Sequence, residues 1–202
     1  TQFSTFYLSI VRKKFKFQGK TYYIPKDFIL QNKNETTHYK LKTDLTKKQF
    51  ILFGGFSIIM VYEALYNSNV KIAVKIYCEK KKKTNTNFLK NYELSFYKSI
   101  DYEKEPCSKN ICLCYGYKQE LYKNKYNFTY LFLEHLEYDL FEYIFKFYDF
   151  KHLFINYNQH KDLLVTIANT LKYIHNKGYI YNDLKLENIM ITKENQIKLI
   201  DF

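Results

Sequence analysis

The sequence predicts an α+β fold in two lobes. Stretches with the alternating pattern of strands fill most of the chain up to residue 134, and apolar residues at helical spacing recur between residues 139 and 175. Hydrophobic residues make up 47% of the 202 residues and aromatic residues 20%, which is enough apolar material for a real core. The predicted order is strands, one helix, strands and then helices, and this order is typical of the α+β class.

The composition excludes several classes of protein. A disordered chain would be poorer in apolar residues, and a collagen-like chain would be richer in Gly and Pro. The 32 Lys and Arg residues against 20 Asp and Glu give a formal charge of +12, which at first favours a nucleic-acid partner. The basic runs at 12–20 and 80–83, however, are typical of solvated loops and strand edges, so no nucleic-acid partner is expected.

The cysteines and the apolar segments point to an intracellular protein. Four cysteines are too few for a disulfide scaffold, and we interpret them as reduced packing residues of a cytoplasmic protein. Cys112 and Cys114 alternate in an apolar run that reads as one strand face. The apolar segment at 5–11 is too short to span a membrane and lacks the order of a signal peptide. The oligomeric state is left open.

Residues 1–49 form a predicted N-terminal extension. Apolar and polar residues alternate on both sides of a Gly-containing turn at 15–24, which indicates a β-hairpin. The polar stretch at 31–49 is rich in Asn, Thr and Lys and predicts a loop or linker.

From residue 50 onward the pattern predicts a second, larger domain. Apolar residues at helical spacing predict helices at 88–100, 139–150 and 161–175, and Gly178 should end the last of these. Short apolar runs predict the strands, which are expected at 50–53, 58–62, 70–77, 111–117, 129–134, 189–192 and 196–200.

One short loop carries the strongest chemical signal. Asp183, Lys185 and Asn188 lie between a helix and a hairpin, and the hairpin leads to Asp201. Phosphoryl transfer needs a carboxylate to orient the attacking hydroxyl and a cation to neutralise the moving group. It also needs an amide and a second carboxylate to hold Mg²⁺, which prefers such hard oxygen ligands.

This loop resembles the catalytic loop of the protein kinase superfamily. The family pattern His-Arg-Asp-Leu-Lys-Pro-Glu-Asn corresponds to Tyr-Asn-Asp-Leu-Lys-Leu-Glu-Asn at 181–188, and Asp201-Phe202 corresponds to the start of Asp-Phe-Gly. The resemblance covers residues 50–202, with a small lobe and hinge at 50–136 and the start of a large lobe at 137–202. It implies a two-lobed kinase-like fold with an antiparallel sheet and one helix in the first lobe.

The resemblance also implies a role for each residue that matches a family motif. Asp183 and Lys185 would be catalytic, and Asn188 and Asp201 would bind Mg²⁺. Lys75, in the Ala-Val-Lys context of the family's third strand, would bind the α- and β-phosphates of ATP, and Glu93 would pair with it. Further contacts to ATP are implied for Gly54, Gly55, Val61, Ala73, Glu134, Leu136, Asp139 and Met190. For Asp139, a helix N-cap is an equally good interpretation.

Two departures from the family pattern affect the prediction. If Gly54 is the first glycine of the glycine-rich loop, Phe56 and Ile59 stand where the family has glycines; alternatively 55–57 is the loop tip and Ser57 replaces the last glycine. In either case bulkier residues keep backbone N–H groups farther from phosphate. Asn182 replaces the family's arginine, so we expect that activation-loop phosphorylation does not switch the protein through this residue.

The predicted function is transfer of the γ-phosphoryl group of ATP to Ser or Thr of protein substrates, because Lys185 is typical of Ser/Thr-type members. A small-molecule kinase of the choline or aminoglycoside type is one alternative, and a pseudokinase or interaction module is another. The chain starts at Thr1 and ends at Phe202, where a kinase domain of usual size would continue for about a hundred residues. We therefore expect that these residues alone phosphorylate peptides inefficiently.

Overall fold

The computed structural model describes residues 4–17, 20–32, 35–42, 51–53, 57–80, 92–147 and 157–202. The chain forms two compact units. The sheet unit comprises Gln2–Lys90 and Cys114–His135, and the helical unit comprises Asn91–Leu113 and Leu136–Phe202. The α+β class predicted from the sequence is confirmed, with strands dominating the first unit and helices the second.

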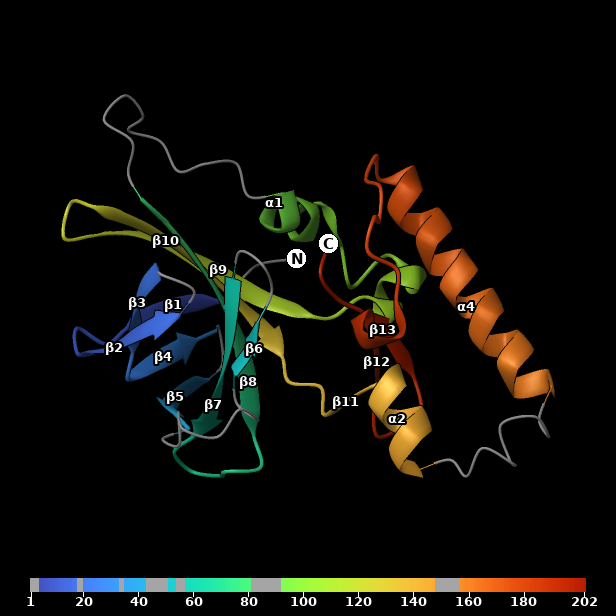
Figure 1. The fold of residues 1–202 in the computed structure, drawn as a ribbon, viewed down its shortest axis with the longest axis horizontal. Coiled ribbons are helices and arrows are strands. Elements are labelled where there is room, and N and C mark those ends of the chain that lie inside the picture. Colours follow the sequence, from blue (N-terminus) through green and yellow to red (C-terminus); the bar gives the residue numbers. More distant parts are fainter. Residues whose placement is uncertain are drawn as a thin grey trace. The chain divides into compact units, whose positions relative to one another are not determined.

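Ten strands are described in the sheet unit (Figure 1). Most of them carry the β-branched and aromatic residues that favour extended backbone. In chain order they are β1 (Thr5–Leu8), β2 (Arg12–Phe17), β3 (Lys20–Pro25), β4 (Asp27–Gln31), β5 (Thr36–Leu41), β6 (Ile51–Phe53), β7 (Ser57–Ala64), β8 (Lys71–Lys80), β9 (Cys114–Tyr122) and β10 (Tyr126–Glu134).

Seven of these strands form one antiparallel series in the order β1-β4-β5-β7-β8-β10-β9. β6 pairs with β7 beside this path, and β2 pairs with β3 as a separate hairpin. The two ends of the series meet, because the Ser4 N–H donates a hydrogen bond to the carbonyl oxygen of Tyr115 at 2.9 Å. The series therefore closes on itself in the manner of a barrel.

An aromatic core fills one face of this series. Along β7 the side chains of Ile58, Met60 and Tyr62 are buried in alternation with less buried neighbours, as the two-residue period of a strand requires. The ring of Phe6 stacks on Phe132 with 3.6 Å between centroids. The ring of Phe28 lies 4.9 Å from Phe132 and 5.0 Å from Tyr62. The N-terminal strands thus contribute to the same core as the strands after residue 50.

The N-terminal extension differs in part from its prediction. The hairpin expected at 15–24 is present as β2 and β3. The loop or linker expected at 31–49 is wrong for 36–41, because those residues form β5, which pairs with β7 from Tyr39 to Leu41. Thr37, Tyr39 and Leu41 face inward, and this burial outweighs the polar composition of the segment. A domain boundary at residue 50 stays a prediction.

The helical unit contains three described α-helices, α1 (Tyr92–Ser99), α2 (Leu140–Phe147) and α4 (Tyr157–Asn176). Its short strands are β11 (Tyr138–Asp139), β12 (Ile189–Ile191) and β13 (Ile197–Leu199), which form one small sheet, and its 3-10 helices are η2 (Pro106–Asn110) and η3 (Leu186–Asn188). The predicted helices and the two last strands are found here, although residues 88–91 and 148–150 lie outside the described part. No helix in the described part is long and apolar enough to cross a bilayer.

Two local features of the helical unit test the sequence analysis. Gly178 adopts a φ of +79° directly after α4, and its N–H donates to His175, so the predicted helix stop is confirmed. The strand predicted at 111–117 is wrong at its start, because β9 begins only at Cys114. Cys112 instead donates its N–H to the carbonyl of Leu199 at 3.0 Å, so Cys112 and Cys114 do not share a strand.

Candidate active site

In the sheet unit, the predicted nucleotide-binding residues lie on the face opposite the aromatic core. Val61 pairs with Ala73 between β7 and β8, and Lys75 pairs with Ile59. Because side chains alternate along a strand, these residues share a face that excludes the buried Met60 and Val74. Lys75 is itself buried, and its ammonium lies 5.6 Å from the centre of the Tyr77 ring.

The two predicted hinge residues lie at the end of β10 and just after it in the sequence. Glu134 is the last residue of β10 and pairs with Ile72 of β8, and Leu136 follows two residues later. The predicted glycine-rich turn, with Gly54 and Gly55, lies outside the described residues.

Glu93 belongs to the helical unit. It lies in the first turn of α1, where an acidic side chain interacts favourably with the helix dipole, and it is buried. Lys75 belongs to the sheet unit, so the predicted pair of Lys75 with Glu93 stays a prediction.

Within the helical unit, the structure brings the three catalytic-loop residues together. The side-chain amide of Asn188 donates to the backbone oxygen of Asp183 and to its Oδ2, each at 2.8 Å. Lys185 Nζ donates to the same Oδ2 at 2.8 Å. Asn188 is only 3% exposed, whereas Asp183 and Lys185 are exposed, so a buried amide holds a carboxylate that solvent and substrates can reach.

These contacts set the charge of the loop. The hydrogen bond from Lys185, followed by that from Asn188, lowers the pKa of Asp183 below its usual value. The same contact with Asp183 raises the pKa of Lys185. Asp183 is therefore a carboxylate and Lys185 an ammonium at neutral pH.

Asp201 is joined to this loop through the backbone. The Ile200 N–H donates to the carbonyl of Asn188 at 3.2 Å, and the Tyr181 hydroxyl donates to the carbonyl of Ile200 at 2.6 Å. Asp201 has a φ of +61°, a left-handed conformation that costs a non-glycine residue free energy. Such strain persists only where surrounding contacts impose it. Here the two hydrogen bonds made by the backbone of Ile200 hold the neighbouring residue in place.

Phe202 anchors the segment on α1. Its ring stacks on Phe96 at 4.2 Å between centroids and lies 5.6 Å from the Tyr97 ring and 5.4 Å from the Tyr181 ring. The helix that carries Glu93 and the segment that carries Asp201 are thereby packed together within one unit.

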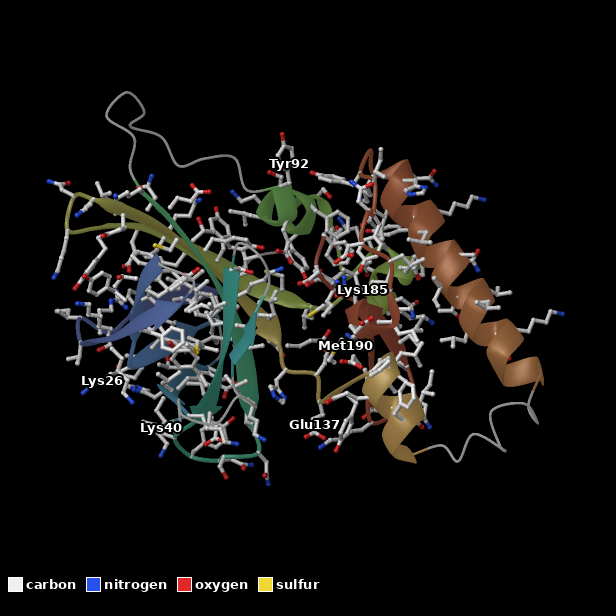
Figure 2. The ribbon with its side chains drawn as sticks, viewed as in Figure 1. Lys26, Lys40, Tyr92, Glu137, Lys185 and Met190 are labelled. Atoms are coloured by element: carbon white, nitrogen blue, oxygen red, sulfur yellow. The ribbon has the colours of Figure 1, made fainter. Side chains whose placement is uncertain are left out.

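Asp139 and Met190 meet in the small sheet of the helical unit. They are direct partners in the ladder between β11 and β12, and Met190 is buried. Met190 is labelled in Figure 2. Asp139 Oδ1 accepts the N–H of Glu142 at 2.6 Å, so the N-cap interpretation of this residue is confirmed. Burial raises the pKa of Asp139.

The donor set of the loop fits Mg²⁺ better than a transition metal. Asn188 directs its amide nitrogen toward Asp183, so its carbonyl oxygen would be the atom to bind a metal ion, and Asp201 would add carboxylate oxygen. Among the described residues no group of three or more His, Cys, Asp and Glu side chains forms a metal cluster. A site with few protein ligands, completed by phosphates and water, is what Mg²⁺ uses in kinases.

A polar cluster that no sequence pattern indicated surrounds Glu105, in the loop between α1 and η2. Glu105 accepts hydrogen bonds from the Lys177 ammonium, from the Tyr173 hydroxyl at 2.5 Å and from the Asp101 N–H at 2.9 Å. The bond from Lys177 contributes most to lowering the pKa of Glu105 to about 2. Glu105 is one of several acidic residues in a polar loop, and no motif or spacing distinguishes it from the others.

Comparison with known proteins agrees with this geometry. A model of the protein kinase domain matches residues 46–202. Serine/threonine-protein kinase PRR2 of Saccharomyces cerevisiae is 29% identical over 174 residues, which is 82% of this chain and 22% of that protein. The probable serine/threonine-protein kinase fnkB of Dictyostelium discoideum is 38% identical over 95 residues, or 46% of this chain and 16% of that protein. The chain spans less than a quarter of the length of either relative.

Proposed function

The chain belongs to the protein kinase family, and on this premise we propose that it transfers the γ-phosphoryl group of ATP to Ser or Thr hydroxyls of protein substrates. The observation that carries the proposal is the hydrogen-bonded arrangement of Asp183, Lys185 and Asn188. Both donors bind the same carboxylate oxygen of Asp183. The other oxygen, Oδ1, would therefore accept a hydrogen bond from the substrate hydroxyl and orient this hydroxyl for attack.

Lys185 would supply the positive charge during transfer. Its ammonium lies 2.8 Å from Asp183 and is exposed, so the side chain can also reach a phosphoryl group beside the attacking hydroxyl. Placing a cation where negative charge develops stabilises the transition state without reorganisation. A lysine two residues after the aspartate supports the Ser/Thr class over the Tyr class, as the family resemblance implies.

ATP would lie against the sheet face that carries Val61, Ala73 and Lys75. Val61 and Ala73 are direct ladder partners, so together they make a small apolar surface suited to a purine ring. Lys75 would bind the α- and β-phosphates, with Glu93 as its partner. Asn188 and Asp201 would hold Mg²⁺, which when bound neutralises the phosphate oxygens.

The test measures binding and transfer on the 202-residue chain. Thermal shift with Mg-ATP, compared with ATP in EDTA, reports nucleotide binding, and transfer from γ-labelled ATP to a Ser/Thr peptide library reports catalysis. We expect a shift that requires Mg²⁺ and is lost in Lys75→Met. We also expect slow transfer that Asp183→Asn lowers by about 10²-fold or more. Lys193→Met, in the exposed turn between β12 and β13, is the matched control for the lysine variant.

Three outcomes would contradict the proposal. Mg-ATP binding with transfer no faster than in Asp183→Asn would make the protein a nucleotide-binding pseudokinase. Transfer to choline or an aminoglycoside but not to peptides would assign a small-molecule acceptor. A lack of any Mg-dependent shift would remove ATP as the donor.

A further inference from the structure

The net positive charge of the chain comes from the sheet unit. Its two segments, Gln2–Lys90 and Cys114–His135, contain 21 lysines and arginines against seven aspartates and glutamates, a formal charge of +14. The helical unit contains 11 basic residues against 13 acidic ones, a formal charge of −2. Charge concentrated in one unit produces a stronger field there than the same charge spread evenly, and it favours an anionic partner of that unit.

A short turn in the sheet unit presents an apolar tip. Ile10 is 96% exposed and Val11 is 53% exposed, between β1 and β2. The backbone of the turn is fixed on both sides, because the Ser9 N–H donates to Asp27 and the Lys26 N–H donates to the carbonyl of Val11, each at 3.0 Å. The Val11 N–H donates to the hydroxyl of Ser9 at 3.1 Å. These hydrogen bonds fix the backbone of the turn, and the side chains of Ile10 and Val11 are exposed to solvent.

Several lysines lie near this tip or on the strands that continue from it. Lys26 is bonded to the turn itself, and Lys14, three residues beyond Val11 on β2, is exposed and pairs in register with Tyr23. Lys123, in the turn between β9 and β10, places its ammonium 5.1 Å from the centre of the same Tyr23 ring. The ammonium of Lys125 lies 5.5 Å from the centre of the Tyr126 ring, which is 6.0 Å from the Tyr23 ring. We call the following residues together the basic face: Ile10, Val11, Lys14, Lys26, Lys123 and Lys125.

Two acidic residues of the sheet unit each stand beside a basic residue. Asp27 lies opposite Lys40 in the ladder between β4 and β5. Glu120 accepts two hydrogen bonds from the Arg12 guanidinium, at 2.9 and 3.0 Å. Figure 2 shows Lys26 and Lys40 at the same end of the sheet unit. Because the formal charge of the sheet unit is +14, its acidic residues do not offset the charge of these lysines.

We propose that the basic face binds the surface of an anionic lipid bilayer. Ile10 and Val11 would enter the boundary between headgroups and acyl chains, and the four lysines would lie among the lipid phosphates and carboxylates. The apolar tip favours a bilayer over nucleic acid, because an aliphatic side chain gains free energy at the acyl boundary. A single-stranded nucleic acid is bound instead by open aromatic rings, whereas here Tyr23 packs against Tyr122 at 4.6 Å and lies under Lys123.

Vesicle co-sedimentation of the 202-residue chain tests this proposal. Vesicles of phosphatidylcholine alone are compared with vesicles containing about one third phosphatidylserine, at about 0.1 M and about 0.5 M NaCl. We expect binding only to the anionic vesicles, weakened by the higher salt. Lys14→Glu with Lys26→Glu should weaken it about 10²-fold or more, since each lysine near such a surface contributes about fivefold and each change reverses a charge. Ile10→Ser should weaken it about tenfold.

The controls separate a defined face from general charge attraction. Lys161→Glu with Lys172→Glu changes the net charge equally on exposed positions of α4 and should leave vesicle binding unchanged. Circular dichroism checks that each variant is folded. Equal losses in both double variants would overturn the proposal. So would an Ile10→Ser variant that binds vesicles normally, or an oligonucleotide that binds as tightly as the anionic vesicles.

Discussion

Lys177, directly after α4, donates hydrogen bonds from its ammonium to the carboxylate of Glu105 and to the carbonyl oxygen of Ser99, the latter at 2.9 Å. Ser99 is the last residue of α1, and Lys177 lies six residues before Asp183. One ammonium therefore links the end of the helix that carries Glu93 to the segment that leads into the catalytic loop. Both lie in the helical unit.

The first prediction concerns acid stability. The pKa of Glu105 is lowered to about 2, so its ion pair stabilises the fold fully above the unfolded value near 4.5 and is lost as the pH falls through about 2. Glu105→Gln should lower the melting temperature at pH 6 and flatten its dependence between about pH 4.5 and 2. Glu103→Gln, in the same loop and exposed, serves as the control. Identical acid profiles for the wild type and Glu105→Gln would contradict the assignment.

The second prediction concerns the buried amide of the catalytic loop. Asn188→Ala removes two hydrogen bonds to Asp183, including the one to its carboxylate, and also removes one of the two proposed Mg²⁺ ligands. Phosphotransfer should fall by about 10²-fold, and the Mg²⁺ concentration for half-maximal activity should rise. Kinetics across a Mg²⁺ titration measure both effects. Asn176→Ala, at the exposed end of α4, should change neither value, and a normal Mg²⁺ dependence in Asn188→Ala would exclude Asn188 as a ligand.

A third prediction addresses the buried ion pair of the sheet unit. The Arg12 side chain is 8% exposed and binds both carboxylate oxygens of Glu120, and one of these also accepts the Tyr130 hydroxyl at 2.8 Å. Arg12→Met leaves a largely buried carboxylate without its cation, which should cost about 3 kcal/mol in the free energy of unfolding. The double change Arg12→Met with Glu120→Met should recover most of this loss. Denaturant unfolding of the three proteins gives the comparison, and a double variant no more stable than the single one would refute the argument.

A fourth prediction concerns the closure between β1 and β9. A Cβ atom added at Gly116 would lie 2.7 Å from Phe6 Cε2 and 3.0 Å from the carbonyl oxygen of Ser4. Phe6 is buried and stacked on Phe132, so its ring has little room to move. Gly116→Ala should therefore destabilise the protein by about 1–3 kcal/mol.

A second variant, Phe6→Leu, tests whether the steric conflict with Phe6 causes this loss of stability. It shortens the side chain that the new methyl group meets. In thermal unfolding, Gly116→Ala should cost less in the Phe6→Leu background than in the wild type. An equal cost in both backgrounds would show that the conflict with Phe6 is not the reason.

The parts of the fold that were predictable from sequence depend on local patterns. Asp183, Lys185 and Asn188 lie within six residues, so their spacing alone predicted a loop that the structure closes with hydrogen bonds. Gly178 predicted the end of α4 because only the residues next to it determine that turn. The strand β8 was predicted from the mainly apolar, β-branched stretch at 70–77, which is typical of a central strand of a sheet.

The parts that were missed depend on contacts between distant segments. β5 is polar at four of its six positions, and its pairing with β4 and β7 explains why it is extended. Glu105 meets Lys177 and Tyr173 across about 70 residues of sequence, so no local motif indicates the contact. Cys112 is tied to Leu199 rather than to the strand that follows it.

The hydrogen bond between Ser4 and Tyr115 has a consequence for how the protein is made. The two ends of the closed strand series are separated by about 110 residues, so the series cannot be completed during synthesis until β9 and β10 have left the ribosome. Until then, β1, β4 and β5 have only part of their aromatic core to bury. A nascent chain at this stage exposes strand edges that aggregate readily, and its yield in cells should depend on chaperones that cover them.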